Sequence, residues 1–263
     1  MHNPYAGIDY GALLADRRIL LAGEGEVVRC AEEAFTAQGA QVYRIPVPSA
    51  SDDPALREAA DKAAQDGGFD GLVYWTGLCR DGELYRTDPA AVSAEMQRWF
   101  GGFAACMRAV LPDFMAGRFG TVAAGIRDLA VSAVPGEAVC AAVSGAILSY
   151  VRAIAVEYAR YSVRANCVMT GYSLAEAGDE RIRRVGEAQA EDDFSRFPAL
   201  HRRALPEDAV NCLLFLLSDM SNAITGEAIP VDGGLNVIGH SQVWNRPEGP
   251  AFTMSLPKRK EAR

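Results

Sequence analysis

Cys140 is the residue best suited to chemistry by its type, and it stands near the start of the apolar run AVCAAVSGAILSYVRAIAVEYARY, residues 138–161. A cysteine thiolate is a strong nucleophile, and a neighbouring cation such as Arg127 would favour the thiolate form. No histidine stands near Cys140 in the sequence to act as its base, and buried thiols are mostly inert. Two interpretations remain: an activated nucleophile, or a small apolar core residue, which we favour.

The histidines and the other cysteines are scattered along the chain. His2, His201 and His240 lie far apart without the spacing of metal ligands, so we expect no metal site. The cysteines form no CxxC pair, which is typical of a reduced intracellular protein: Cys30, Cys79, Cys106, Cys140, Cys167 and Cys212. No signal-peptide pattern opens the sequence, and no apolar stretch approaches about 18 uninterrupted residues. We expect a cytoplasmic protein with no membrane partner.

Three large aromatic residues, Tyr74, Trp75 and Trp99, stand at or after predicted buried segments. They could line a pocket for a ligand that carries a ring. Alternatively, they fill space inside the fold, which we favour because an empty cleft would lose packing energy.

Length and composition indicate one folded domain over residues 1–263. The chain is 49% hydrophobic and 23% charged, which is enough to bury a full core. Its net charge of -8 at pH 7 argues against a nucleic-acid partner, because such proteins gather Lys and Arg on one face. The short basic ending KRKEAR is expected to be a solvated terminus.

Strand patterns alternate with amphipathic helix patterns along the chain. Predicted strands cover residues 17–23, 40–47, 70–75, 120–126, 163–171 and 226–234. Predicted helices cover residues 26–39, 53–67, 89–117, 138–161 and 206–219. This alternation favours an α/β fold with a doubly wound parallel sheet. The segment 172–205 is polar and less periodic, so it is either a lid or partner-contact region or a pair of surface helices.

Two stretches, residues 140–171 and 204–237, carry motifs of a known family. The matching positions are Arg152, Ala155, Glu157, Arg164, Asn166 and Gly171, then Ile224, Thr225, Gly226, Asp232, Gly233 and Gly234. On these residues the chain resembles the classical short-chain dehydrogenase/reductase family, with weaker similarity back to about residue 18. The resemblance implies that family's Rossmann-like fold and, in its active members, a nicotinamide cofactor.

The cofactor loop departs from the family pattern. Active members hold the pyrophosphate over a TGxxxGxG loop, where absent side chains let the backbone approach the anion. In register, its three glycine positions hold Ala22, Glu26 and Val28. A carboxylate at Glu26 would repel a pyrophosphate, and Val28 would crowd the contact between helix and sheet. Gly23 and Gly25 form a displaced GxG, which alone is weak evidence for a cofactor.

The adenosine side of the family's cofactor site is also shortened. The family usually inserts a helix and a strand after the second strand, whereas here VYRIPVPSASDDP, residues 42–54, crosses directly to the next helix. No acidic residue closes the second strand to hold a ribose hydroxyl, and Arg44 is the only candidate for a 2′-phosphate. We therefore expect no cofactor in this chain, with NAD(P) held by an active partner subunit.

The family's catalytic group is replaced at all four positions. Active members use a tyrosine as proton donor, a lysine that assists it, and a serine and an asparagine that complete the relay. The matching positions hold Cys140 for the tyrosine, Ser144 for the lysine, Arg127 for the serine and Trp99 for the asparagine. We expect none of these four residues to be catalytic.

The segments that build the family's subunit interfaces are nevertheless well matched. The resemblance therefore implies a catalytically inactive subunit that pairs with an active paralogue, as a heterodimer or heterotetramer, or with itself. An extension over residues 238–263 offers Trp244, Phe252 and Met254 as anchors for a neighbouring subunit. Two alternatives remain: a redox-neutral enzyme of the lyase, cyclase or dehalogenase type in the remodelled cleft, and a ligand-binding or regulatory protein.

Overall fold

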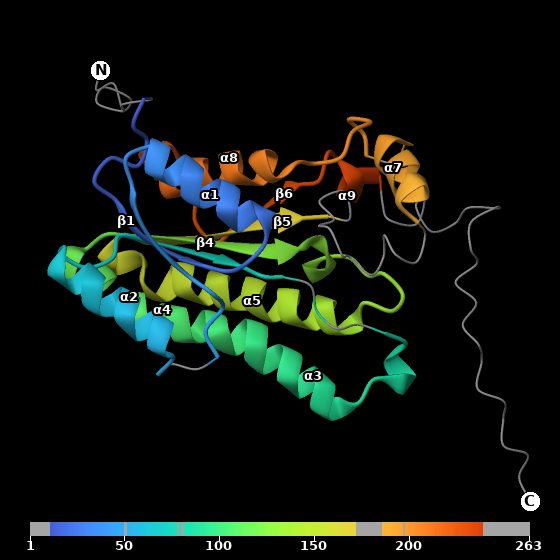
Figure 1. The fold of residues 1–263 in the computed structure, drawn as a ribbon, viewed down its shortest axis with the longest axis horizontal. Coiled ribbons are helices and arrows are strands. Elements are labelled where there is room, and N and C mark those ends of the chain that lie inside the picture. The colour runs from blue at the N-terminus through green and yellow to red at the C-terminus, as the bar shows by residue number, and fades with distance from the viewer. Residues whose placement is uncertain are drawn as a thin grey trace, which may run out of the picture.

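A six-stranded parallel sheet forms the centre of the molecule in this computed structural model (Figure 1). The structure describes residues 11–49, 52–77, 79, 82–171, 186–196 and 198–238. The strands run in the order β2-β1-β3-β4-β5-β6. Their bounds are β1 Arg18–Ala22, β2 Gln41–Ile45, β3 Gly71–Trp75, β4 Gly120–Arg127, β5 Val163–Thr170 and β6 Ala228–Val231.

Helices cover both faces of this sheet, which confirms the doubly wound α/β fold (Figure 1). On one face lie α2 (Pro54–Gln65), α4 (Gly102–Gly117) and α5 (Ala138–Glu157), which share an apolar core with the sheet. On the other lie α1 (Glu26–Ala37) and α8 (Pro206–Leu217), around a second apolar core. Strands β4 and β5 are buried along all eight residues each, as expected for strands covered on both faces.

The adenosine-side segment is short, as predicted from the sequence. After β2, at the edge of the sheet, the chain enters α2 and then returns to β3 on the far side of β1. Asp53 caps α2, because its side chain accepts a hydrogen bond from the N–H of Ala55, and Pro54 fills the first helical position. The direction of strand addition therefore reverses between β1 and β3, which is where a doubly wound sheet forms its ligand crevice.

The helix predicted over residues 89–117 has an interruption. It consists of α3 (Pro89–Met96), a π-helical turn η2 (Gln97–Gly101) and α4. The π turn adds one residue to the helical repeat and so changes the direction in which Trp99 leaves the helix. The next helix also differs from its prediction, because α5 ends at Glu157 and a 3₁₀ turn, η4 (Ala159–Tyr161), follows.

Short elements complete the described chain. They are the 3₁₀ turns η1 (Leu84–Arg86), η3 (Asp128–Ala130) and η6 (Asp219–Ser221), and the helices α7 (Glu187–Arg196) and α9 (Leu235–Ile238). Within the predicted lid or partner-contact region, α7 is described and residues 172–185 lie outside the described residues. The C-terminal extension beyond residue 238, with its three proposed anchors, also lies outside them.

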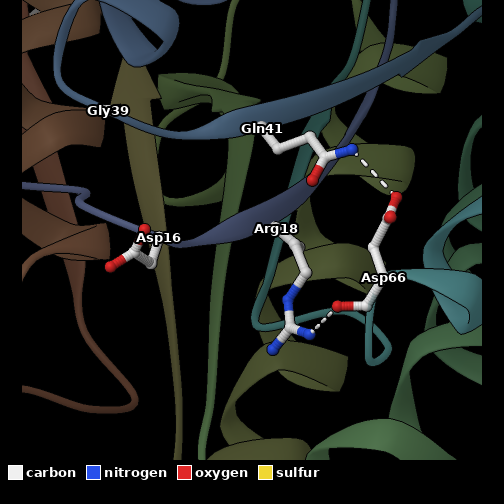
Figure 2. Close-up of a pocket in the computed structure, with 5 residues that line it drawn as sticks. All are labelled: Asp16, Arg18, Gly39, Gln41 and Asp66. Atoms are coloured by element: carbon white, nitrogen blue, oxygen red, sulfur yellow. Dashed lines mark hydrogen bonds between the residues drawn. The ribbon is translucent and has the colours of Figure 1, made fainter.

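The amino ends of β1 and β2 border a polar cavity of about 440 Å³ (Figure 2). Arg18 reaches from β1 to two acidic residues: its Nε donates to Asp70 at 2.7 Å, and its Nη1 donates to the carbonyl of Asp66. Gln41 donates to the Asp66 carboxylate at 2.9 Å. Because the side chains of Arg18 and Asp66 are engaged with the protein, we interpret this cavity as a structural feature of the amino edge.

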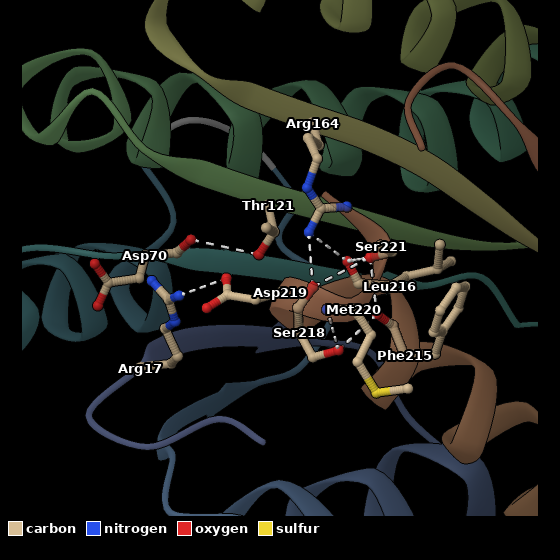
Figure 3. A network of polar contacts seen from close by, with 10 residues as sticks. All are labelled: Arg17, Asp70, Thr121, Arg164, Phe215, Leu216, Ser218, Asp219, Met220 and Ser221. Carbon is tan, nitrogen blue, oxygen red and sulfur yellow. Dashed lines mark hydrogen bonds and ion pairs between the residues drawn. The ribbon is translucent and has the colours of Figure 1, made fainter. Parts of the chain in front are cut away.

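A buried arginine joins β5 to the end of α8 (Figure 3). Nη2 of Arg164 donates to the carbonyls of Leu216 at 2.9 Å and Ser218 at 3.1 Å, and Nη1 donates to Ile224 at 3.4 Å. The last carbonyls of a helix have no partner within it, so a guanidinium placed there satisfies them. Burial lowers the pKa of Arg164 from its ordinary value.

Candidate functional site

Trp75 ends β3 at the carboxyl edge of the sheet, and its indole lies over the neighbouring strand β4. Its side chain is only 4% exposed, and a Cβ atom placed on Gly125 of β4 would lie 2.1 Å from the indole ring. On the other side, a Cβ on Gly23 would lie 2.9 Å from Cβ of Trp75 and 3.0 Å from its carbonyl oxygen. The indole therefore packs directly on the backbone of β4, at the place where the fold class usually receives a ligand.

Tyr74 and Trp99 form a second aromatic group on the other face of β3. The Tyr74 hydroxyl donates to the carbonyl of Trp99 at 2.6 Å, and Trp99 Nε1 donates to the Glu95 carboxylate at 2.9 Å. A Cβ on Gly77 would lie 2.6 Å from the Trp99 ring, so this ring covers the end of β3. Burial raises the pKa of Tyr74, which keeps its hydroxyl protonated. This arrangement favours the interpretation that the aromatic residues fill space.

The three degenerate glycine positions surround the start of α1. Ala22 and Val28 are buried, and Cγ2 of Val28 would lie 3.0 Å from a Cβ on Gly23. Gly25 precedes the helix with φ of 96°, a conformation that glycine adopts readily. Glu26 begins the helix, and its side chain is 62% exposed. A negative side chain at a helix N-terminus takes the position that favours an anionic ligand, so a pyrophosphate there would meet a like charge.

Two of the four catalytic positions are brought into direct contact. The backbone N–H of Arg127, at the end of β4, donates to Oγ of Ser144 on α5 at 3.3 Å. Cys140 lies one turn earlier on the same face of α5 and is 4% exposed, while Ser144 is 1% exposed. Trp99 instead bonds to Glu95, as described above. The Ser144 hydroxyl, which accepts a hydrogen bond from a backbone N–H, supplies neither the positive charge of the family's lysine nor the proton of its tyrosine.

Two buried acidic residues lie beside this place: Asp232, which belongs to the family motif, and Asp128, which the sequence motifs do not include. Asp128 and Asp232 are buried, and a Cβ on Gly171 would lie 2.9 Å from Oδ2 of Asp128 and 3.2 Å from Cβ of Asp232. The Asp232 carboxylate accepts from the N–H groups of Gly234 and Asn236, both at 2.8 Å. The adjacent charges in GIRDLA, directly after an apolar strand, were the available signal for Asp128.

A cavity of about 320 Å³ lies at the carboxyl end of β6. Arg202, in its wall, donates to both carboxylate oxygens of Asp208, at 2.7 and 3.0 Å. This ion pair lowers the pKa of Asp208 and neutralises the charge that Arg202 would offer to a ligand. Among the residues that the structure describes, no group of three or more His, Cys, Asp or Glu could hold a metal ion.

Several thiols are held in the neutral form by burial. Burial raises the pKa of Cys106, that of Cys167 to about 12, and that of Cys212 to about 11. These three cysteines are therefore poor nucleophiles near neutral pH.

Helix α5, which carries Cys140 and Ser144, is unusually apolar for a helix with an open face. Its mean hydropathy reaches 1.8 over 18 residues, and among the described helices it alone has the length and composition to cross a membrane. Half of this stretch is buried against the fold, as in a core helix packed on a sheet. The other half leaves apolar surface exposed.

Comparison with known proteins identifies the family. Residues 18–236 match the family described as Enoyl-(Acyl carrier protein) reductase. A short-chain dehydrogenase/reductase family oxidoreductase from Burkholderia thailandensis is 26% identical, with a TM-score of 0.75 over 87% of this chain and 96% of the other. This chain belongs to the short-chain dehydrogenase/reductase family, as its sequence motifs predicted.

Two curated relatives from Xanthobacter autotrophicus carry related names. 2-(S)-hydroxypropyl-CoM dehydrogenase 3 is 27% identical over 88% of this chain and 86% of its own length. Inactive 2-(S)-hydroxypropyl-CoM dehydrogenase 2 is 26% identical over 80% of this chain and 91% of its own length. The family thus includes a relative of similar extent whose name describes it as inactive.

Proposed function

We propose that this chain is a non-catalytic subunit that assembles with a catalytically active paralogue in an oxidoreductase complex. One observation carries the proposal: the Trp75 indole is buried at the carboxyl edge of the sheet, against the backbone of Gly125. The replacement of the family's proton donor and lysine by Cys140 and Ser144 supports the same conclusion. In this proposal NAD(P) and the reacting substrate bind to the partner subunit.

The outer face of α5 supports assembly. Its exposed residues are mostly small or apolar, and Val156 has 81% of its surface exposed. Within α5 only Arg152 and Glu157 are charged, so the helix offers a face from which water is readily excluded. The partly exposed β6 at the edge of the sheet offers a second contact surface.

A particular complex fits this arrangement as a finer proposal. The two-subunit 2-[hydroxy(phenyl)methyl]succinyl-CoA dehydrogenase of anaerobic toluene degradation pairs a degenerate subunit with an active one, and this chain resembles the degenerate subunit. The substrate of the complex would then be a β-hydroxyacyl-CoA, bound by the active subunit.

The cofactor test uses the isolated chain. Because Glu26 and Val28 replace loop glycines and the Trp75 indole is buried at the carboxyl edge of the sheet, calorimetric titration with NAD(H) or NADP(H) is expected to give no measurable heat of binding at millimolar cofactor. A dissociation constant in the micromolar range would contradict the proposal.

The partner test uses co-expression with a neighbouring paralogue that retains the tyrosine and lysine. Mass measurement of the intact complex is expected to show both chains in one assembly, with dehydrogenase activity that the paralogue alone lacks or shows weakly. If this chain stays monomeric with and without the paralogue, the subunit hypothesis fails and a redox-neutral enzyme becomes the better explanation.

A further inference from the structure

Arg127 carries a buried guanidinium with two unsatisfied nitrogens. The residue is 6% exposed, Nε and Nη2 are both shielded from solvent, and neither has a hydrogen-bond partner among the residues that the structure describes. Burying a charge without a partner costs several kcal/mol, so native proteins rarely do it without a compensating group. By comparison, Arg164 is buried to a similar extent, and its guanidinium donates to three carbonyls.

The backbone of Arg127 is held in place because this residue ends strand β4. Arg127 ends β4 in register with Thr170 of β5, and its N–H is held by Ser144. Side chains alternate along a strand, so Arg127 follows Gly125 on the face that carries the Trp75 ring. The guanidinium is thus anchored at the carboxyl edge of a central strand, where doubly wound sheets bind ligands.

The neighbouring carboxylates have other surroundings. Oδ2 of Asp128 lies toward Gly171 and the side of Asp232, and both oxygens of Asp232 accept backbone N–H groups. Within the part of the chain that the structure describes, neither carboxylate accepts a hydrogen bond from Nε or Nη2 of Arg127. The group that completes the site must bring acceptor oxygens of its own.

We propose that Arg127 is the recognition group for the oxyanion of a small molecule, either a carboxylate or a phosphate. A guanidinium offers two parallel N–H donors in a planar fork, which matches two oxygens of such a group. The bound anion would accept from Nε and Nη2 together and would neutralise the buried charge. This site goes beyond the proposed function, because it depends neither on the partner subunit nor on a cofactor.

Thermal unfolding with two probes tests the site. Wild-type protein is heated with inorganic phosphate, with succinate, and with sodium chloride at matched ionic strength. A probe at about tenfold its dissociation constant is expected to raise Tm by about 4 °C above the chloride control. The larger of the two shifts distinguishes a phosphate from a carboxylate ligand.

Three variants locate the effect. Arg127→Met is expected to lose the anion-dependent shift and, without probe, to melt no lower than wild type, because it removes an uncompensated buried charge. Arg127→Lys keeps the charge without the fork, so its shift is expected to fall to less than half. The matched control Arg57→Met removes an exposed arginine on α2 and is expected to keep the full shift.

The proposal is overturned if neither probe raises Tm of the wild type above chloride. It is equally overturned if the shift persists in Arg127→Met. Should Arg127→Met fail to fold, the Arg127→Lys series and direct calorimetric titration of wild type decide the question, since retention of the full shift by lysine contradicts recognition by a fork.

Discussion

At the scale of single residues, Cys140 and Ser144 differ in size and charge from the tyrosine and lysine that the family pattern predicts at their positions. Both are buried, and the Ser144 hydroxyl holds the backbone of Arg127 at the end of β4. A lysine at this position would lose that contact and bring a charge into a space fitted to a hydroxyl. Restoring the family's reductase chemistry here would therefore require more than changing these two side chains.

The double variant Cys140→Tyr with Ser144→Lys is expected to show no reductase activity. The transition state needs a bound cofactor and a positioned proton donor together, and the double variant leaves Glu26, Val28 and the buried Trp75 unchanged. Oxidation of NADPH with a ketone substrate measures this, with Ser149→Lys on the exposed face of α5 as a control for adding a lysine. Turnover well above background would mean that a usable cofactor site survives.

Thiol reactivity follows burial. At about pH 8, Cys106, Cys167 and Cys212 are expected to react with iodoacetamide far more slowly than free cysteine, because burial raises their pKa and leaves little thiolate. For Cys212, whose pKa is about 11, the rate is expected to rise steadily as the pH approaches that value. Mass spectrometry of digested protein assigns each site, and labelling after unfolding provides the control. Labelling of native Cys106 at the free-cysteine rate contradicts this assignment.

Some features of single residues could be predicted from the sequence, and others could not. The four changed catalytic positions follow from residue type and register and stay a prediction. The same reasoning favoured a filling role for Tyr74 and Trp75, because large rings stand where the family pattern has small amides, and both side chains are buried. The sequence does not show that Tyr74 bonds to the backbone of Trp99, since this contact depends on the π turn. Nor could it show that Nε and Nη2 of Arg127 are buried without a partner among the described residues, because an arginine at a strand end is more often exposed.

At the scale of elements, side-chain hydrogen bonds of two arginines connect neighbouring helices, strands and turns. Arg164 connects β5 with the end of α8, and Arg17 reaches Asp219 in the next turn at 3.0 Å. The second contact is on the surface and adds little to stability, whereas the first satisfies helix carbonyls in the interior.

Arg164→Met is expected to lower the free energy of unfolding by about 2–4 kcal/mol. The methionine keeps much of the apolar volume but removes the guanidinium hydrogen bonds to the buried carbonyls of Leu216 and Ser218, which then keep, within the described chain, only their contacts with Ser221. Denaturant unfolding followed by circular dichroism measures the change, and Arg57→Met on the surface of α2 is the control, expected to change stability by less than about 0.5 kcal/mol. Equal stability of Arg164→Met and wild type would show that solvent replaces the arginine.

Element boundaries were predictable where local chemistry sets them. Asp53 and Pro54 begin α2 as the sequence indicated, because a capping side chain and a fixed φ act within one turn. The π turn at Gln97–Gly101 has no such local signal. It is favoured by tertiary contacts, since Gly102 approaches Tyr74 and Pro48 so closely that a Cβ would lie 2.8 Å from each.

At the scale of the whole molecule, the outer face of α5 is the surface most suited to a second subunit. Its small residues permit close approach of another helix, and its few charges limit the desolvation cost. Tyr150 belongs to the inner side of this helix, because its ring packs edge-on against Phe100 and Phe103. The contact with a partner is therefore centred on Ala153 and Val156, which are exposed.

Ala153→Arg is expected to prevent assembly while the fold survives. An unpaired charge in a buried contact costs several kcal/mol, which weakens a micromolar association by orders of magnitude. Size-exclusion chromatography with light scattering measures assembly with and without the paralogue, and circular dichroism checks the fold. Arg108→Ala, an exposed residue of α4, is a control for changes of surface charge. An assembly of unchanged mass in Ala153→Arg would move the interface away from α5.

The packing of Trp75 on Gly125 also constrains how this sequence can change. Any side chain at Gly125 would collide with the indole, while shortening Trp75 alone would leave a void that costs about 3–5 kcal/mol. Each position thus penalises a single substitution at the other, which makes the pair strongly epistatic. A mutational path that opens this space begins with the loss of the Trp75 ring and so passes through a destabilised protein, which needs a ligand or a second substitution to restore its stability.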